Sequence, residues 1–541
     1  MSDNTIKNNN ISDNVKKEIE KRRTFAIISH PDAGKTTLTE KFLLYGGAIN
    51  TAGSVKGKAN SKYAVSDWME IEKERGISVT SSVLQFNYGG FCINILDTPG
   101  HQDFSEDTYR TLMAADSAVM VIDASKGVEA QTIKLFKVCV MRHIPIFTFI
   151  NKMDRDAKDS FELLDDIETV LGIRTCPVNW PIGSGKEFKG IYDRKAKTVR
   201  TFEPVATGGA KSAAETDYSI DDKELQDVVP GHLYSQLIEE IELLDGASDP
   251  LDPVKVQKGE LSPVFFGSAL NTFGVGIFLK YFLDMTSTPL PRLSNEGLIN
   301  PVEEPFSAFV FKIQANMNKS HRDRIAFLRI CSGRFDASAD VYHVQSGRRL
   351  KLSQPQQIMA QDRQVVSEAY AGDVIGVFDP GIFSIGDTIT MPGRKFEYEG
   401  IPTFAPEHFC RVIQLNSMKR KQFVKGITQI AQEGAIQIFQ EYTAGMSEII
   451  VGVVGVLQFD VLKYRLENEY GCEIRLESLP YGFIRWVGNP ETDVTKLKRM
   501  NNVKAVKDMK GSPLLLFVNE WMIKMVLDDN EGLELLEFKK N

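Results

Sequence analysis

The sequence predicts an α/β domain with a mostly parallel sheet, followed by a β-barrel domain and an α+β domain. Three observations predict this order. The first half alternates apolar strands with helical stretches, the middle changes to short strands between glycine turns, and the last part returns to mixed periodicities. With 541 residues, the chain is also too long for a single hydrophobic core.

Composition shifts along the chain indicate where these domains begin and end. Four prolines between residues 289 and 305 mark a linker. The stretch between Asp154 and Ser268 is longer than one helix and one strand require, so we expect an inserted subdomain at about 157–260. The expected units are a flexible tail over 1–20, an α/β domain over 21–290, a β-barrel domain over 300–395, and an α+β domain with a C-terminal extension over 400–541.

Near-continuous apolar runs in the first domain are typical of strands that are covered on both faces. These runs are residues 24–28, 91–96, 118–122, 146–150 and 264–266. Each run ends where a polar motif begins. Ligand sites in open α/β sheets form at the carboxyl ends of the strands, so we expect these motifs to meet at one edge of the sheet.

The strands of the barrel and of the third domain are predicted from shorter sequence patterns than those of the first domain. The predicted barrel strands are residues 306–313, 325–331, 339–344, 373–378 and 387–390. The third domain places strands at 412–415, 435–439, 448–453 and 472–476, with helices that end at Gly434 and Gly471. This strand and helix order predicts a ferredoxin-like split βαβ sandwich. The remaining tail, with apolar runs at 481–487 and 514–518, is expected to be ordered but short.

The loop after residues 24–28 matches a phosphate-binding loop at every chemically demanding position except the first. It consists of Ser29, His30, Pro31, Asp32, Ala33, Gly34, Lys35, Thr36 and Thr37. Gly34 lets the backbone approach an anion at a helix N-terminus, and Lys35 can reach the β and γ phosphates. The Thr36 hydroxyl suits a Mg²⁺ ligand. Ser29 replaces the usual glycine and is small enough to permit a tight turn.

A second motif suggests hydrolysis of the terminal phosphate. It consists of Asp97, Thr98, Pro99, Gly100 and His101. Asp97 ends a strand where a carboxylate can hold Mg²⁺ through water, and Gly100 offers a backbone N–H to the γ-phosphate. His101 is the candidate catalytic residue, since an imidazole there can orient the attacking water. For this motif alone, a plain turn remains the alternative. His30 is interpreted as structural.

The third motif selects the base. Asn151, Lys152, Met153 and Asp154 follow the fourth apolar run. Guanine presents N1–H and an N2 amino group, which the Asp154 carboxylate can accept together, whereas adenine has neither. Ser268 and Ala269 would add a backbone amide for guanine O6. The predicted cofactors are therefore GTP or GDP with Mg²⁺.

Net charge, cysteine spacing and the length of apolar runs limit the partners and the compartment that we expect for this chain. The net charge of −8 argues against coating nucleic acid by overall electrostatics, so an RNA partner would contact basic patches at 347–351, 419–421 or 496–510. The six cysteines show no paired spacing and are expected to be reduced, without a metal site. No apolar run has the length of a signal peptide or a membrane span, so we expect a cytoplasmic protein without a membrane partner.

With these motifs the chain resembles the translational GTPases, most closely the bacterial peptide-chain release factor 3 family. The resemblance runs from about residue 20 to the end. It is carried by the motifs that begin at Ser29 and Asp97, by Arg-Gly-Ile-Ser from Arg75, and by Val-Val-Gly-Val-Leu-Gln-Phe-Asp-Val-Leu from Val453. It implies that Lys35 contacts phosphate with Thr36 on Mg²⁺, and that His101 positions the water.

The resemblance also implies a switch. Ser78, where most relatives carry threonine, would bind Mg²⁺ only in the GTP state. Ile77 and Pro31 would flank His101 as gate residues, although Pro31 departs from the usual valine or isoleucine. No arginine is an evident finger for the transition-state charge, so slow intrinsic turnover is expected. The implied activator is the ribosome, whose large-subunit RNA would bring His101 into place.

By this resemblance, the chain would be a monomeric GTPase of translation termination that ejects class I, codon-reading release factors from the ribosome. An elongation factor G-like translocation GTPase is the nearest alternative. After the third domain, however, only about 60 residues remain, whereas such relatives carry further domains there. A GTP-gated binding module with negligible turnover is the alternative from another class, and the presence of His101 argues against it.

Overall fold

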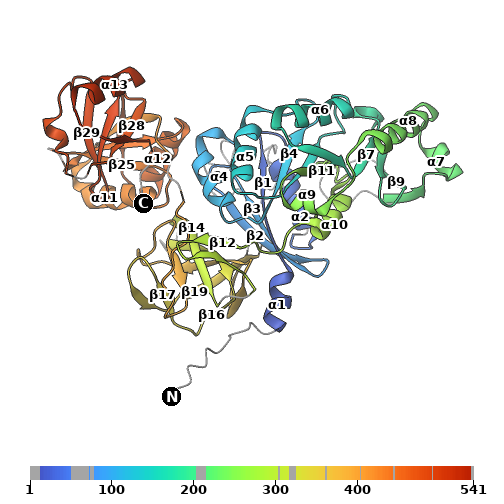
Figure 1. Ribbon diagram of the computed structural model, residues 1–541, viewed down its shortest axis with the longest axis horizontal. Helices are drawn as coiled ribbons and strands as arrows, with labels where there is room; N and C mark the ends of the chain where they lie inside the picture. Colours follow the sequence, from blue (N-terminus) through green and yellow to red (C-terminus); the bar gives the residue numbers. More distant parts are fainter. Residues whose placement is uncertain are drawn as a thin grey trace, which may run out of the picture.

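The computed structural model describes residues 13–49, 72, 78–202, 215–302, 305–315, 324–359, 362–401, 404–442, 445–489 and 491–537. Of the residues singled out in the sequence, Arg75 and Ile77 lie outside the described ranges. Figure 1 shows three lobes in chain order, from the blue and green nucleotide-binding domain through a yellow barrel to an orange and red C-terminal domain. This order confirms the predicted fold class.

The sheet of the first domain has the strand order β2-β3-β1-β4-β5-β11-β6. The bounds are β1 Arg22–Ser29, β2 Ser82–Tyr88, β3 Phe91–Asp97, β4 Ser117–Asp123, β5 Ile146–Asn151, β6 Arg174–Pro177 and β11 Leu261–Phe266. All neighbouring pairs are parallel apart from β2 with β3. The five apolar runs of the sequence are thus strands, and their carboxyl ends lie along one edge, as predicted.

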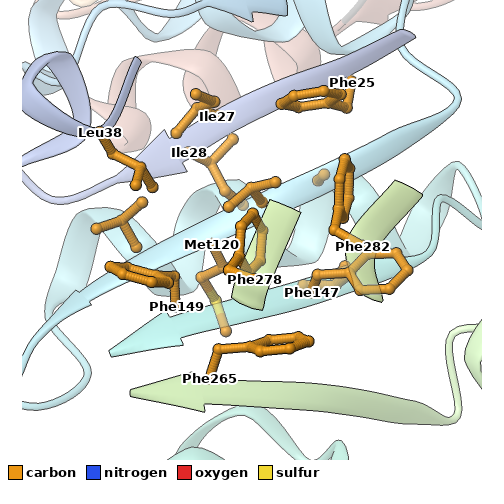
Figure 2. Packing of buried hydrophobic residues seen from close by; sticks show 14 of the residues in the cluster. Phe25, Ile27, Ile28, Leu38, Met120, Phe147, Phe149, Phe265, Phe278 and Phe282 are labelled. Carbon is orange, nitrogen blue, oxygen red and sulfur yellow. The ribbon is translucent and has the colours of Figure 1, made fainter. Parts of the chain in front are cut away.

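Helices pack against this sheet and hold it rigid. They are α2 Lys35–Tyr45, α4 Ser105–Leu112, α5 Ala130–Met141, α6 Ser160–Leu171 and α10 Val275–Met285. Figure 2 shows Phe278 and Phe282 of α10 among aromatic side chains of the strands. The Phe282 ring centroid lies 4.6 Å from that of Phe25 on β1 and 4.8 Å from that of Phe147 on β5. Large rings that interlock in this way fix the strand ends that carry the motifs.

The region predicted as an insertion contains a four-stranded antiparallel sheet in the order β10-β9-β8-β7. Its elements are β7 Asn179–Ile182, η2 Gly185–Glu187, β8 Gly190–Asp193, β9 Thr198–Phe202, β10 Glu215–Ser219, α7 Lys223–Val228, α8 Gly231–Ala247 and α9 Pro253–Gln257. Trp180 of β7 is fully buried, and its ring lies 5.2 Å from that of Phe266 on β11. The insertion therefore shares its core with the main sheet.

The barrel continues the first sheet, because β19 pairs with β2. Its strands are β12 Arg292–Ser294, β13 Gly297–Ile299, β14 Ser307–Ala315, β15 Arg324–Ser332, β16 Arg334–Asp336, β17 Val341–His343, β18 Arg348–Leu350, β19 Ser353–Met359, β20 Asp362–Val365, β21 Glu368–Tyr370, β22 Val374–Phe378 and β23 Thr388–Thr390. The short strands β12, β13, β16 and β21, of three residues each, were not predicted. Strands β18 to β20 were not predicted either, because their glutamine- and arginine-rich sequence lacks apolar alternation.

The tail before the first strand is more ordered than the sequence suggested. Residues 13–20, predicted as part of a flexible tail, form helix α1 Asp13–Glu20. Ile19 is fully buried in the hydrophobic core of the barrel, and Glu18 pairs with Lys21 at 2.7 Å and with Arg22 at 2.6 Å. Apolar contacts of Ile19 and Val15 with the core of the barrel fix this helix, and local sequence does not reveal such contacts.

The third domain has the predicted ferredoxin-like strand order β27-β24-β26-β25, and the sheet then continues as β29-β30-β28-β31. Its elements are β24 His408–Gln414, η3 Ser417–Lys419, α11 Arg420–Gln432, β25 Gln437–Glu441, β26 Gly445–Val453, α12 Leu457–Asn468, β27 Ile474–Leu479, β28 Phe483–Val487, η4 Val494–Lys496, β29 Val503–Asp508, β30 Pro513–Phe517, α13 Glu520–Asp529 and β31 Leu535–Leu536. The tail therefore completes one sheet, with its own apolar clusters on both faces.

Two buried ion pairs join the first two domains. Arg22 of β1 reaches Asp373 at 3.2 Å, and Arg329 of β15 contacts Asp116. Burial makes such pairs costly to break from one side, so they hold the barrel against the first sheet. Among the described helices, none combines the length and hydropathy that crossing a bilayer requires.

Candidate nucleotide site

The phosphate-binding loop lies between β1 and α2, and its geometry depends on glycine. Gly34 caps α2 with a φ of 100°, in the left-handed region. A Cβ at this position would lie 2.2 Å from Asn151 Nδ2, so a larger residue would collide with the third motif. Asp32 also has a positive φ, of 65°. The loop is therefore folded tightly against Asn151, and Ser29 at its start is buried at the end of β1.

Lys35 and Asp97 meet where the first two motifs converge. Lys35 Nζ lies 2.7 Å from Asp97 Oδ1 and also donates to the Thr98 carbonyl. Both side chains are buried, so each charge compensates the other. Thr98 Oγ1 donates to Ile27 O at 2.7 Å, which ties the second motif to β1. Thr36, next to Lys35, is half-buried at the first turn of α2.

Asn151 links three of the predicted motifs. Its Nδ2 donates to Ala33 O at 2.8 Å, which anchors the phosphate-binding loop. Its Oδ1 accepts from the Lys152 N–H at 2.9 Å and from the Ala269 N–H at 2.8 Å. The sequence predicted that Ser268 and Ala269 supply a backbone amide for guanine O6, whereas in the structure the Ala269 N–H donates to Asn151 and the Ser268 N–H donates to Phe273 O at 3.0 Å. Ser268 Oγ accepts from the backbone of Asn271 at 3.3 Å, which shapes the turn.

Lys152 lies beneath the phosphate-binding loop. Its φ is 72°, and its Nζ donates to Asp32 O at 2.5 Å and to Asp123 Oδ2 at 2.6 Å. Burial of Asp123 opposes ionisation, but hydrogen bonds from Lys152 and Ser125 outweigh it and hold the pKa of Asp123 below its ordinary value. The sequence reasoning missed Asp123. Its position directly after the predicted strand 118–122 was the available signal.

The carboxylate of Asp154 has the character expected of a base-binding group. Its Oδ1 is buried and has no hydrogen-bond partner among the described residues. The neighbouring Met153 N–H donates to Gly267 O at 3.1 Å, which fixes the turn that presents Asp154. A buried acceptor without a donor is costly, so this oxygen suits the adjacent donors of guanine. Hydroxyl and carboxylate oxygens at Thr36 and Asp97 likewise match the ligand preference of Mg²⁺.

His101 caps the short helix η1 Gln102–Phe104 and is 34% exposed. Its Nδ1 lies 3.0 Å from Asp103 Oδ1 and 3.3 Å from Asp103 N. Preceding it, Gly100 packs against Pro31, since a Cβ on Gly100 would lie 3.5 Å from Pro31 Cα. His30 Nε2 lies 3.4 Å from Glu129 Oε1, while its Nδ1 is buried without a hydrogen-bond partner among the described residues.

Ser78 is half-buried and begins a segment that is held from several sides. The N–H groups of Val79 and Thr80 donate to Glu72 Oε1 at 2.9 and 3.1 Å. The Ser81 N–H donates to Asp107 Oδ2 at 2.6 Å. The residues just before Ser78, at 73–77, lie outside the described part of the chain.

Lys312 of the barrel adds a further contact to the segment that begins at Ser78. Its Nζ contacts Ser81 O, and donates to Ser81 Oγ at 3.0 Å. Burial lowers the pKa of Lys312. Burial opposes ionisation of Asp107, yet the nearby charges of Lys312 and Arg110 hold the pKa of Asp107 below its ordinary value. The barrel therefore touches the segment that begins at Ser78, a relationship that no sequence motif indicated.

Comparisons with known proteins agree with this geometry. Three family models match in order: elongation factor Tu GTP binding domain over residues 20–288, elongation factor G domain 2 over 305–391, and class II release factor RF3, C-terminal domain over 398–527. A crystal structure of a protein from Thermus thermophilus superposes with a TM-score of 0.69 at 22% identity, covering 88% of this chain and 71% of that one. At that identity the likeness concerns the fold alone.

Curated relatives match at higher identity. Peptide chain release factor 3 of Symbiobacterium thermophilum is 58% identical over 521 residues, covering 96% of this chain and 98% of its own length. The protein of the same name from Microcystis aeruginosa is 53% identical over 517 residues, covering 96% of this chain and 95% of its own. The similarity therefore extends across all three lobes of Figure 1.

Proposed function

The chain belongs to the peptide chain release factor 3 family and is a GTPase of translation termination; from this premise we propose that the ribosome activates it to eject a codon-reading class I release factor. It acts as a monomer in the cytoplasm, where ribosomes are found. One observation carries the nucleotide site: three motifs converge on the Asn151 side chain, and beside them a buried carboxylate oxygen of Asp154 has no partner among the described residues.

Guanine is recognised by Asp154, which accepts from N1–H and from the N2 amino group. The amide for guanine O6 comes from Leu270, because the Ala269 N–H already donates to Asn151. The Leu270 N–H has no acceptor among the residues that the structure describes. This assignment moves the sequence expectation by one residue along the same turn. Lys152 stiffens the base site through its bonds to Asp32 and Asp123.

The first two motifs converge where the phosphates and Mg²⁺ would be held. On binding of GTP, Lys35 would exchange Asp97 for the β and γ phosphates, and the released Asp97 carboxylate would help to hold Mg²⁺. Both buried charges keep a partner throughout this exchange. Thr36 and Ser78 supply hydroxyl ligands, and the Gly100 N–H contacts the γ-phosphate. When bound, Mg²⁺ neutralises charge on the β and γ phosphates.

Hydrolysis depends on His101, which orients the attacking water. The imidazole is partly exposed, so a macromolecule docked on this face can reach it. The sequence supplies no evident arginine finger, and intrinsic turnover is therefore slow until a partner completes the site. We propose that the ribosome is this partner. Loss of the Ser78 contact to Mg²⁺ and of the Gly100 contact to the γ-phosphate would then drive the conformational change.

A translocation GTPase is not favoured, because the C-terminal segment matches the class II release factor and full-length relatives carry that name. The test measures multiple-turnover GTP hydrolysis by wild type and His101→Ala, each with and without ribosomes. We expect stimulation by ribosomes for wild type alone. Equal, negligible rates in all four reactions would contradict enzymatic turnover and favour a GTP-gated binding module.

A further inference from the structure

Asp103 lies between the candidate catalytic histidine and the C-terminal domain. It belongs to η1, and its side chain is only 6% exposed. One carboxylate oxygen, Oδ1, lies 3.0 Å from His101 Nδ1. The other, Oδ2, accepts the Leu457 N–H at 2.8 Å, at the start of α12 in the third domain. A single carboxylate therefore contacts His101 and the C-terminal domain at once.

The first turn of α12 is built to receive this carboxylate. The N–H groups of Val454 and Gly455 both donate to Gln458 Oε1 at 3.0 Å. The Leu457 N–H is a helix N-terminal donor that the helix itself cannot satisfy, and Asp103 satisfies it. The positive end of the helix dipole also favours a carboxylate at this place.

Close approach of the two domains requires glycine at position 455. A Cβ there would lie 2.2 Å from Asp103 Cγ and 2.5 Å from its Cα. The adjacent Phe104 is buried in a small apolar cluster with Val79 and Val461 of α12. Steric fit, a charge-assisted hydrogen bond and apolar packing thus hold α12 against η1.

The contact between His101 and Asp103 favours one tautomer. If Nδ1 accepts the Asp103 N–H at 3.3 Å, its lone pair faces a carboxylate oxygen at 3.0 Å, which is repulsive. If Nδ1 carries the proton, it donates to that oxygen in a charge-assisted bond. The second arrangement is therefore favoured, and it leaves the Nε2 lone pair free to accept from a water.

We propose that Asp103 is a positioning residue: it holds His101 with a proton on Nδ1, and docking of α12 on the same carboxylate fixes that orientation. Movement of the C-terminal domain then alters how His101 presents Nε2 to the attacking water. The inference rests on the role of His101 in the proposed function. It makes the C-terminal domain part of the control of hydrolysis.

The primary test replaces Asp103 by asparagine in the full-length protein. The amide oxygen can still accept from Leu457, while the amide NH₂ donates to His101 Nδ1 and moves the imidazole proton to Nε2. We expect ribosome-stimulated kcat to fall roughly 10- to 100-fold, part of what a positioned acid–base group contributes. GTP affinity should stay at the wild-type value. Selective ¹⁵N-histidine labelling should show the tautomer change at His101.

A purely structural role for Asp103 would leave the His101 tautomer unchanged, and that result would overturn the proposal. His101→Ala is measured alongside to separate two failures. If His101→Ala retains the wild-type rate, the catalytic assignment itself is wrong. If His101→Ala is inactive while Asp103→Asn keeps both its rate and its tautomer, only the positioning role is wrong.

Coupling to the C-terminal domain is tested with Gly455→Ala, which leaves Asp103 and His101 chemically intact. The added methyl group separates α12 from η1, and we expect kcat to fall about tenfold or more, as for loss of an acid–base orientation. In the double variant with Asp103→Asn, the two losses should not multiply, since both act through one contact. A wild-type rate for a folded Gly455→Ala, or fully multiplicative losses, would overturn the coupling.

Discussion

Lys152 Nζ lies 2.6 Å from Asp123 Oδ2 and 2.5 Å from the carbonyl oxygen of Asp32, so one ammonium joins β4 to the phosphate-binding loop. The sequence did not indicate that Lys152 joins these two segments. Asp123 ends a strand without a recognised motif, and Asp32 contributes only its backbone carbonyl. The arrangement gives the base-binding turn a rigid support, and it can be disturbed without touching the nucleotide.

Asp123→Asn should weaken the binding of GDP and GTP about tenfold. A hydrogen bond to a charged group is worth about 1.5 kcal/mol or more, and its loss leaves Lys152 less firmly held. Equilibrium titration with a fluorescent GDP measures the affinity. Glu162→Gln on α6 is the matched control, since it removes one exposed carboxylate of the same sign. Equal affinities for the Asp123 variant and this control would exclude the supporting role.

The ion pair between Lys152 and Asp123 should make the stability of the folded protein depend on pH. Asp123 has a pKa below the ordinary value of 3.8 in the folded protein, so acid protonates the unfolded chain first and favours unfolding. Its contribution is complete above the ordinary value and is lost as the pH falls through the lower, folded-state pKa. The difference in unfolding free energy between wild type and Asp123→Asn should therefore shrink below about pH 4. Denaturant unfolding at several pH values checks this, and a difference that grows in acid would contradict it.

Asp154→Asn should change base preference. Two guanine donors lose their carboxylate acceptor, at about 1 to 3 kcal/mol for each unsatisfied group, so GTP affinity should fall roughly 10²- to 10³-fold. Xanthine offers a carbonyl in place of the N2 amino group, and the asparagine amide can donate to it. Competition between GTP and XTP is the measurement. A variant that still prefers GTP would show that another residue reads this edge of the base.

Gly34→Ala should abolish tight nucleotide binding. The new methyl group would meet Asn151 Nδ2 at 2.2 Å, in addition to the strain of a φ of 100°. Gly47→Ala provides the control, since Gly47 also has a positive φ, of 66°, but a Cβ there has no neighbour within 4 Å among the described residues. The control should lose only about 1 to 2 kcal/mol of stability from backbone strain. Comparable nucleotide affinities for the two variants would contradict the steric account.

The sequence predicted the strands and motifs that depend on local patterns. Gly34, Lys35 and Asn151 were recognisable because strand ends, turn chemistry and spacing identify such positions. Asp123 and Asp103 were not recognised, because the bond from Lys152 to Asp123 and the bond from Leu457 to Asp103 form only in the folded chain. The Asp103 carboxylate accepts a hydrogen bond from the backbone of Leu457, which lies 354 residues later in the chain.

The same distinction between local patterns and distant contacts applies to the elements of the fold. The apolar runs of the first sheet predicted its strands directly, since burial on both faces leaves a plain signal. Helix α1 and strand β29 lacked such a signal. Ile19 is buried only because the barrel lies beside it, and β29 contains three charged residues without a regular alternation with its apolar ones. Contacts with distant parts of the chain therefore determine that helix α1 and strand β29 form.

We propose that GTP hydrolysis by this chain removes a codon-reading factor from the ribosome after termination. The direct measurement follows a fluorescent class I release factor on terminated ribosomes, with GTP and with a non-hydrolysable analogue, for wild type and His101→Ala. Dissociation should accelerate for wild type with GTP, and repeated rounds should require hydrolysis. Unchanged dissociation of the factor, accompanied by ribosome translocation, would contradict the account.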